Sequence, residues 1–112
     1  MPTYEVQSYH ASLGKLKILA DNTVVEVVAT IRCSTGGRGP LLDIAFIPDG
    51  NPLPANVSQP FNTSFRPLSE YVYYLDMLRN EKPVSIRIEP NDLSRHGLEV
   101  GSEPVGEGEP PT

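Results

Sequence analysis

The feature that most constrains this sequence is a two-residue alternation between residues 23 and 33. Every odd position from Val25 onward is apolar, whereas the even positions include a carboxylate, a hydroxyl and a guanidinium. Successive side chains of a β-strand point to opposite faces, so the pattern predicts a strand with one buried and one solvated face. The predicted inward residues are Val25, Val27, Ala29, Ile31 and Cys33.

Weaker alternations predict further strands, and one segment has helical spacing instead. The other predicted strands lie within residues 3–9, 15–20, 41–47 and 83–89, with a short last one near 98–100, and Asp21 and Asn22 suit a tight turn between two of them. Between Pro67 and Asn80, apolar residues recur three, four, seven and ten positions after Leu68. This spacing places them on one face of an amphipathic helix.

Residues 48–67 contain five prolines and separate the first four predicted strands from the helix. Proline has no amide donor and cannot occupy a central strand, so this stretch is predicted to be a long ordered loop or edge segment. We expect Leu53, Phe61 and Phe65 to pin it onto the body of the protein.

The order of these elements predicts the fold class. Four strands, a loop, a helix and a final long strand indicate a mainly β domain, either all-β or α+β. We expect a small antiparallel sandwich or barrel of about five to six strands, with the helix before the last long strand. Residues 1–100 are predicted to form this single domain, and residues 101–112, rich in Pro, Gly and Glu, a disordered acidic tail.

The net charge of −5 is concentrated at the end of the chain. All nine basic residues and ten of the 14 acidic residues lie within residues 1–98, so this part is nearly neutral. A neutral body lacks the clustered Lys and Arg that bind nucleic acid, so we expect no nucleic-acid partner. No leader-like start and no apolar run of membrane-spanning length is present, which together with a single cysteine predicts a cytoplasmic protein without a membrane partner.

Residues that could support chemistry are few and scattered. His10 and His96 lie at opposite ends of the predicted domain, and no pair of metal ligands has short spacing. Cys33 belongs to the buried register of its strand, where a cysteine acts as a small hydrophobic residue rather than a nucleophile. The sequence therefore assigns no catalytic residue, metal or cofactor, and it favours a binding role over an enzymatic one.

A glycine-rich loop at residues 34–40 has two interpretations. Its glycines could turn several amides toward an anion, with Gly36, Gly37 and Arg38 joined by His10 and His96 around a small anionic molecule or substrate. The alternative is a flexible hairpin connection whose glycines adopt positive φ.

The predicted helix supplies the candidate interface. Tyr73 lies opposite the apolar face, Met77 follows one turn later, and both are expected to contact solvent in a monomer. Tyr and Met are enriched at protein interfaces, so we take Tyr73, Met77 and Glu70 as candidate interface residues. The predicted function is a non-catalytic interaction module that binds a protein partner or forms a homo-oligomer.

Overall fold

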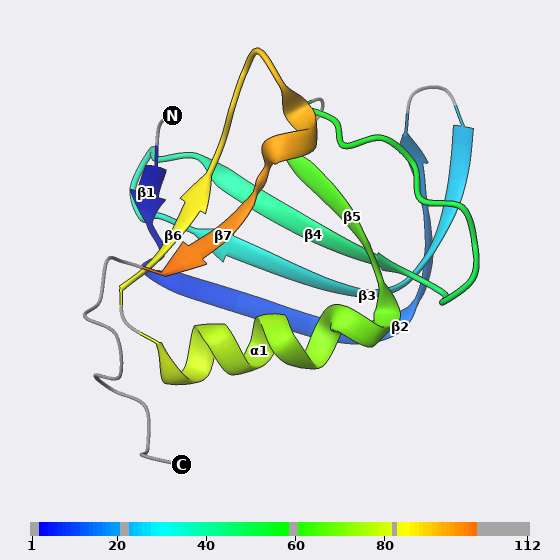
Figure 1. Ribbon diagram of the computed structural model, residues 1–112, viewed down its shortest axis with the longest axis horizontal. Coiled ribbons are helices and arrows are strands. Elements are labelled where there is room, and N and C mark those ends of the chain that lie inside the picture. The colour runs from blue at the N-terminus through cyan, green and yellow to red at the C-terminus, as the bar shows by residue number, and fades with distance from the viewer. Residues whose placement is uncertain (1–2, 21–22, 59–60, 82, 101–112) are drawn as a thin grey trace.

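A computed structural model of the chain describes residues 3–20, 23–58, 61–81 and 83–100 (Figure 1). Within these residues the protein is mainly β, with two sheets and a single α-helix. The predicted turn at residues 21–22 and the predicted tail at residues 101–112 lie outside the described residues. The predicted fold class is confirmed, and the sheets do not close into a barrel.

The larger sheet has four strands in the order β2-β3-β4-β5. These strands are β2 (Ser8–Ala20), β3 (Thr23–Ser34), β4 (Leu41–Ile47) and β5 (Thr63–Pro67). The smaller sheet has the order β1-β6-β7 and is antiparallel throughout. Its strands are β1 (Thr3–Glu5), β6 (Val84–Arg87) and β7 (Gly97–Val100). Two short 3-10 turns, η1 (Leu68–Glu70) and η2 (Leu93–Arg95), and helix α1 (Tyr71–Asn80) complete the fold.

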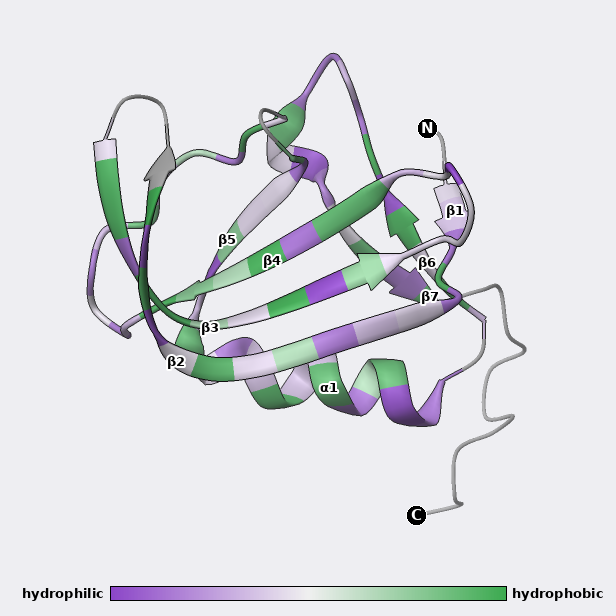
Figure 2. Ribbon diagram, turned by 180° about the vertical axis from the view of Figure 1, so that it is seen from behind, coloured by the Kyte–Doolittle hydropathy of each residue, from purple (hydrophilic) through white to green (hydrophobic). Residues whose placement is uncertain are grey.

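The main core lies between one face of the larger sheet, α1 and the smaller sheet (Figure 1). Its buried members are Ala29, Ile31, Cys33, Leu42, Ile44, Phe46, Val84, Ile86 and Leu98. Phe46 is fully buried, and the rings of Tyr71 and Tyr74 pack against it edge-on at centroid distances of 5.0 and 5.7 Å. Hydrophobic and hydrophilic residues are interspersed along α1 (Figure 2).

The alternation in β3 is confirmed, but its buried residues serve two cores. Ala29, Ile31 and Cys33 belong to the main core. Val25 and Val27 instead form a second cluster with three residues of β4 and β5: Ala45, Ile47 and Phe65. Ala45 alternates with Ile44 and Phe46 along β4, so the second cluster lies on the opposite face of the larger sheet, which we call the outer face.

A β-bulge in β2 explains this change of face. Leu13 pairs with Ala29 and Leu16 with Val27, so Gly14 and Lys15 together face the single residue Val28. Gly14 has a φ of 150°, in a region that favours glycine. Bulges bend a strand and increase its twist, and beyond this one the β2–β3 ribbon curls over the outer face (Figure 1).

The proline-rich stretch ends in an edge strand, β5. Its pairing with β4 is parallel, so the expectation of a wholly antiparallel sheet is wrong at this pair. The missing amide donor of Pro67 is tolerated because β5 lies at the edge of the sheet. The loop before β5 is held by Asn56, whose amide group donates to the Leu93 carbonyl and accepts from the Phe65 amide, both at 3.0 Å. Leu53 and Phe61, expected to pin this segment, remain partly exposed.

Candidate functional site

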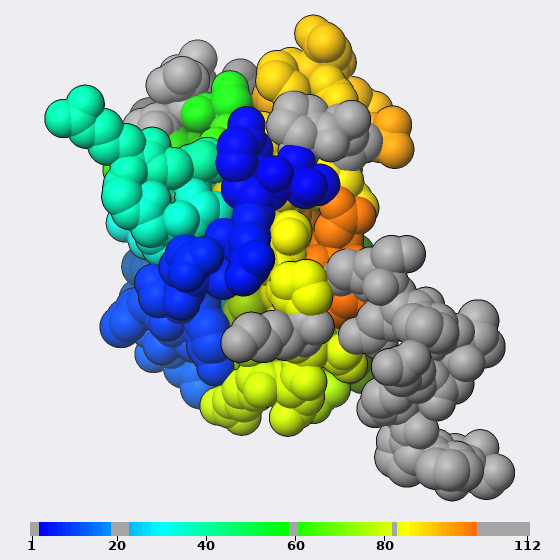
Figure 3. Space-filling model, turned by 90° about the vertical axis from the view of Figure 1, so that its left-hand side faces the viewer, coloured from blue at the N-terminus to red at the C-terminus, as the bar shows by residue number. Residues whose placement is uncertain are grey.

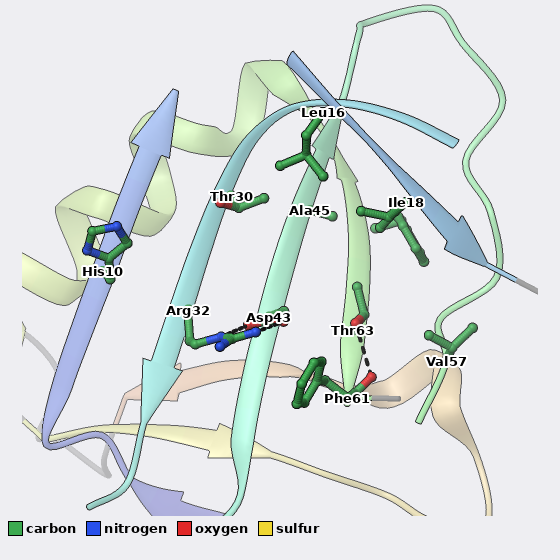
Figure 4. Close-up of a pocket in the computed structure, with 11 residues that line it drawn as sticks. His10, Leu16, Ile18, Thr30, Arg32, Asp43, Ala45, Val57, Phe61 and Thr63 are labelled. Atoms are coloured by element: carbon green, nitrogen blue, oxygen red, sulfur yellow. Dashed lines mark hydrogen bonds and ion pairs between the residues drawn. The ribbon is translucent and has the colours of Figure 1, made fainter. Parts of the chain in front are cut away.

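The outer face of the larger sheet carries a cavity of about 810 Å³ (Figure 4). Its floor is formed by β2, β3, β4 and β5, through Thr30, Ala45, Thr63 and their neighbours. The curled part of β2 forms one wall with Leu16 and Ile18, and the loop before β5 forms another with Val57 and Phe61. The bulge at Gly14 therefore creates the cavity, because it turns the end of β2 over the sheet.

One part of the cavity is polar and contains an ion pair. Arg32 on β3 and Asp43 on β4 face each other in register, and the guanidinium donates two hydrogen bonds to the carboxylate. The distances are 2.7 Å from Nε to Oδ1 and 2.9 Å from Nη2 to Oδ2. The hydrogen bond to Asp43 raises the pKa of Arg32, so the guanidinium remains charged.

Two more side chains, an aromatic ring and an imidazole, lie beside the ion pair. The ring of Phe61 lies 4.8 Å from the guanidinium carbon of Arg32, a distance at which a cation and an aromatic face attract each other. His10 lies on β2 beside this pair, at the margin of the cavity (Figure 4). The rest of the lining is mainly apolar and comprises Leu16, Ile18, Ala45, Val57 and Phe65 with Thr30 and Thr63.

The residues proposed from the sequence for an anion site do not meet in this cavity. His10 lines it, whereas Arg38 lies in the exposed β3–β4 loop and His96 is buried at the start of β7. Gly36 and Gly37 have φ values of 81° and 54°, as a tight turn requires.

The glycine-rich loop forms hydrogen bonds within itself. The Gly39 amide donates to the Gly36 carbonyl at 3.0 Å, the Thr35 hydroxyl to the Pro40 carbonyl at 2.9 Å, and the Gly36 amide to the Ser34 hydroxyl at 3.2 Å. These bonds use two of the amides that an anion would need. The geometry favours the hairpin connection over an anion-binding loop.

The buried titratable groups lie away from the cavity lining. Cys33 is fully buried in the main core, and this burial raises the pKa of its thiol to about 12. His96 is only 5% exposed, and neither of its ring nitrogens has a hydrogen-bond partner in the part of the chain that the structure describes. Across the same residues, no three His, Cys, Asp or Glu side chains are grouped as metal ligands.

The predicted interface residues of the helix have different surroundings. Tyr73 is 71% exposed, and its neighbour Val72 is 62% exposed. Met77 is partly buried and packs against the main core, so it is less exposed than the sequence predicted. Glu70 forms a two-bond ion pair with Arg66, at 2.8 Å from Nε and 2.6 Å from Nη2.

The 3-10 turn at η1 explains the position of Met77. A 3-10 turn advances by about 120° per residue and an α-helix by about 100°, so three residues rotate the following helix by about 60°. This rotation moves Tyr74 and Met77 toward the core. It also moves Val72, which the simple projection placed on the inner face, toward solvent.

Besides the cavity, a second candidate surface is the free edge of β2, which adjoins α1. Strand order places β2 at the edge of the larger sheet, and Leu13 on it is 72% exposed. A smaller hollow of about 290 Å³ is lined by both Tyr9 of β2 and Leu78 of α1. Figure 3 shows that β2 and α1 adjoin at the surface of the molecule.

Sequence reasoning missed the residues that shape both surfaces. Arg32, Asp43 and Phe61 were not singled out as a group because their proximity depends on strand register and on the course of a loop. Gly14 was the available signal, since a glycine inside a strand pattern often marks a bulge.

A comparison of the chain with models of known protein families, with curated proteins and with solved structures finds no match. In the described part of the chain, no helix has the length and apolar character needed to cross a membrane.

Proposed function

We propose that the protein is a non-catalytic interaction module that self-associates through the free edge of β2 and the adjoining side of α1. The observation that carries this proposal is an edge patch of three strongly exposed apolar residues, Leu13, Val72 and Tyr73. Single exposed apolar residues are common, whereas a group of them beside an unpaired strand is typical of an association surface.

α1 runs antiparallel to β2 (Figure 1), and we infer from this that Leu13 lies near the start of α1. Tyr9 and Leu78 share one hollow and so fix the relative position of the two elements. The four steps along the strand from Tyr9 to Leu13 span about 13 Å, a distance that a helix covers in about nine residues. Leu13 is therefore level with η1 and the first turn of α1.

Leu13 also lies on the helix side of the sheet. It is paired with Ala29, a member of the main core, and directly paired residues point to the same face. We infer that Leu13 and the exposed side of α1 border one surface, which ends at the unpaired backbone of β2.

The charges along β2 favour a second copy of the chain as the partner. From Ser8 to Leu13 the strand has no Asp, Glu, Lys or Arg, so two copies can pair antiparallel without opposing like charges. Lys15 and Lys17, which would discourage pairing, lie in the bulge and beyond it, respectively. A two-fold arrangement would join the larger sheets of two copies and bring their α1 helices together.

The oligomeric state of the purified chain tests this proposal, by light scattering during size-exclusion chromatography and by sedimentation equilibrium. We expect a concentration-dependent dimer for the wild type and a monomer for Leu13→Glu/Tyr73→Glu, because buried carboxylates would oppose each other at the interface.

Val24→Glu is the matched control, since Val24 is 65% exposed but lies on β3 near the far end of the β2–β3 ribbon, where it pairs with Leu19. This variant should dimerise like the wild type. A wild type that remains monomeric at high concentration, or a dimer that Leu13→Glu/Tyr73→Glu leaves intact, would contradict the proposal.

A further inference from the structure

We propose that the cavity on the outer face binds a small, mainly apolar molecule that carries an uncharged oxygen acceptor, such as a hydroxyl or carbonyl group. This inference goes beyond self-association, because the cavity and the edge patch lie on opposite faces of the larger sheet. It rests on the shape, the charge and the backbone pairing of the cavity.

The apolar part of the cavity suits the body of such a molecule. Leu16 and Ile18 from β2, Ala45 and Phe65 from the floor and Val57 from the loop surround it on three sides (Figure 4). Leu16 is 41% exposed in the absence of a ligand. A volume of about 810 Å³ lies within the usual range for small-molecule sites.

The polar part suits a hydrogen-bond acceptor. The guanidinium of Arg32 uses Nε and one Nη2 hydrogen for Asp43, and its carbon lies over the ring of Phe61. A guanidinium has five N–H donors, so three remain on the edge that faces away from Asp43. Such a fixed donor can orient an oxygen of a bound molecule.

The charge of this part favours an uncharged acceptor over an anion. The carboxylate of Asp43 balances the guanidinium of Arg32 at two hydrogen-bond contacts. A ligand carboxylate would gain little from the neutral pair and would be repelled by Asp43. Hydroxyl and carbonyl oxygens accept the same hydrogen bonds without that repulsion.

The pairing of the floor strands favours a small molecule over an extended peptide. The floor between β2 and β5 consists of neighbouring strands that already pair with each other. A peptide laid across it would find few free backbone groups and would leave its own polar groups unpaired against an apolar surface. A molecule with one polar end avoids this cost.

The direct test is an NMR titration of the full chain with three probes of equal chain length: 1-decanol, 2-decanone and decanoate. We expect saturable shifts at the amides around Thr30, Arg32 and Ala45 for the alcohol and the ketone. Decanoate should bind at least about tenfold more weakly. Contacts between the methyl group of 1-decanol and the methyl groups of Leu16, Ile18 and Val57 should appear in nuclear Overhauser spectra.

Two variants separate the apolar from the polar contribution. Leu16→Lys places a charge in the apolar part and should weaken 1-decanol binding at least about tenfold, whereas the exposed control Val24→Lys should leave it unchanged. Arg32→Leu/Asp43→Leu removes both members of the pair, which avoids leaving one charge unpaired. This double variant should no longer prefer 1-decanol and 2-decanone over decanoate.

Several outcomes would overturn the inference. No saturable shift with either uncharged probe, or shifts located outside the cavity, would exclude the site. Equal binding of decanoate by the wild type would exclude the assignment of an uncharged acceptor. The wild-type Overhauser contacts decide the location of the ligand even where Leu16→Lys does not fold. Dimerisation is measured separately and its outcome is independent of these results.

Discussion

His96 makes the stability of the protein dependent on pH at the level of a single residue. Burial without a hydrogen-bond partner lowers its pKa from the ordinary value of 6.5, because the charged imidazolium would lose its hydration. The unfolded chain therefore binds a proton at a higher pH than the native protein does. We predict that the free energy of unfolding decreases as the pH falls from 6.5 toward the lowered pKa of the native protein. Above pH 6.5, His96 should have no effect on the pH dependence.

Urea denaturation at a series of pH values between 7 and 5 measures this decrease. These pH values lie above the range in which Glu70 takes up a proton, because its hydrogen bonds to Arg66 lower its pKa. His96→Phe should remove most of the pH dependence, while His10→Gln, at an exposed position on β2, should retain it. An equal slope in wild type and His96→Phe would show that another group is responsible.

Individual buried residues were largely predictable from the sequence. The alternation in β3 identified Ile31 and Cys33 as inward, because the period of a strand depends only on local backbone geometry. The pairing of Arg32 with Asp43 was not predictable in the same way. That pairing depends on the register between β3 and β4. The side-chain pattern of a single strand gives no information about this register.

At the level of elements, the helix shows the limit of periodicity. Its bounds follow from Pro67 and from the polar residues near Asn80, and they are confirmed by η1 and α1. The side of the helix that faces the core was predicted incorrectly for Val72, because periodicity assumes 3.6 residues per turn throughout and η1 is wound more tightly. The exposed side therefore carries Val72 with Tyr73, and Met77 contacts the core.

The bulge in β2 gives a prediction for the element that shapes the cavity. A Cβ atom added at Gly14 would meet no heavy atom within 4 Å, so steric clash is absent. Its φ of 150° is nevertheless unfavourable for any L-residue with a side chain. We predict that Gly14→Ala lowers the free energy of unfolding by about 1–3 kcal/mol, through backbone strain alone.

Thermal and urea denaturation of Gly14→Ala test this prediction, with Ser12→Ala as the control on the same strand. The Ser12 hydroxyl shares only a solvent-exposed hydrogen bond with Thr30, so we expect its loss to change stability by less than about 1 kcal/mol. If Gly14→Ala is as stable as the wild type, then the bulge does not require glycine.

At the level of the whole molecule, the order in which the strands pair could not be predicted from the sequence. Six of the observed strands lie in predicted segments: β1, β3, β4, β6 and β7, with most of β2. The parallel pairing of β5 with β4 depends on the course of the chain from Ile47 to Thr63, over which proline-rich composition predicts only irregular backbone. Without β5 the outer face lacks one side of the cavity, so the candidate site was not predictable either.

The two cores of the larger sheet should unfold together, because β3 and β4 contribute side chains to both. Phe46 is fully buried in the main core, and Phe65 is 2% exposed in the second cluster. Truncating a buried phenylalanine removes its transfer free energy and leaves a void, so Phe46→Ala should cost about 3–5 kcal/mol. Phe65→Ala should cost less, because water can already reach the cavity that Phe65 lines.

Both variants should nevertheless shift one common transition. Urea unfolding followed by far-UV circular dichroism reports the sheets, and tyrosine fluorescence reports Tyr71 and Tyr74 beside Phe46. Because the second cluster shares its strands with the main core, Phe65→Ala should lower the midpoint seen by both probes, and by the same amount. Val24→Ala, at an exposed position, should leave both midpoints unchanged. Two separate transitions in Phe65→Ala would mean that the curled β2–β3 ribbon unfolds as an independent unit, and the cavity would then open without loss of the main core.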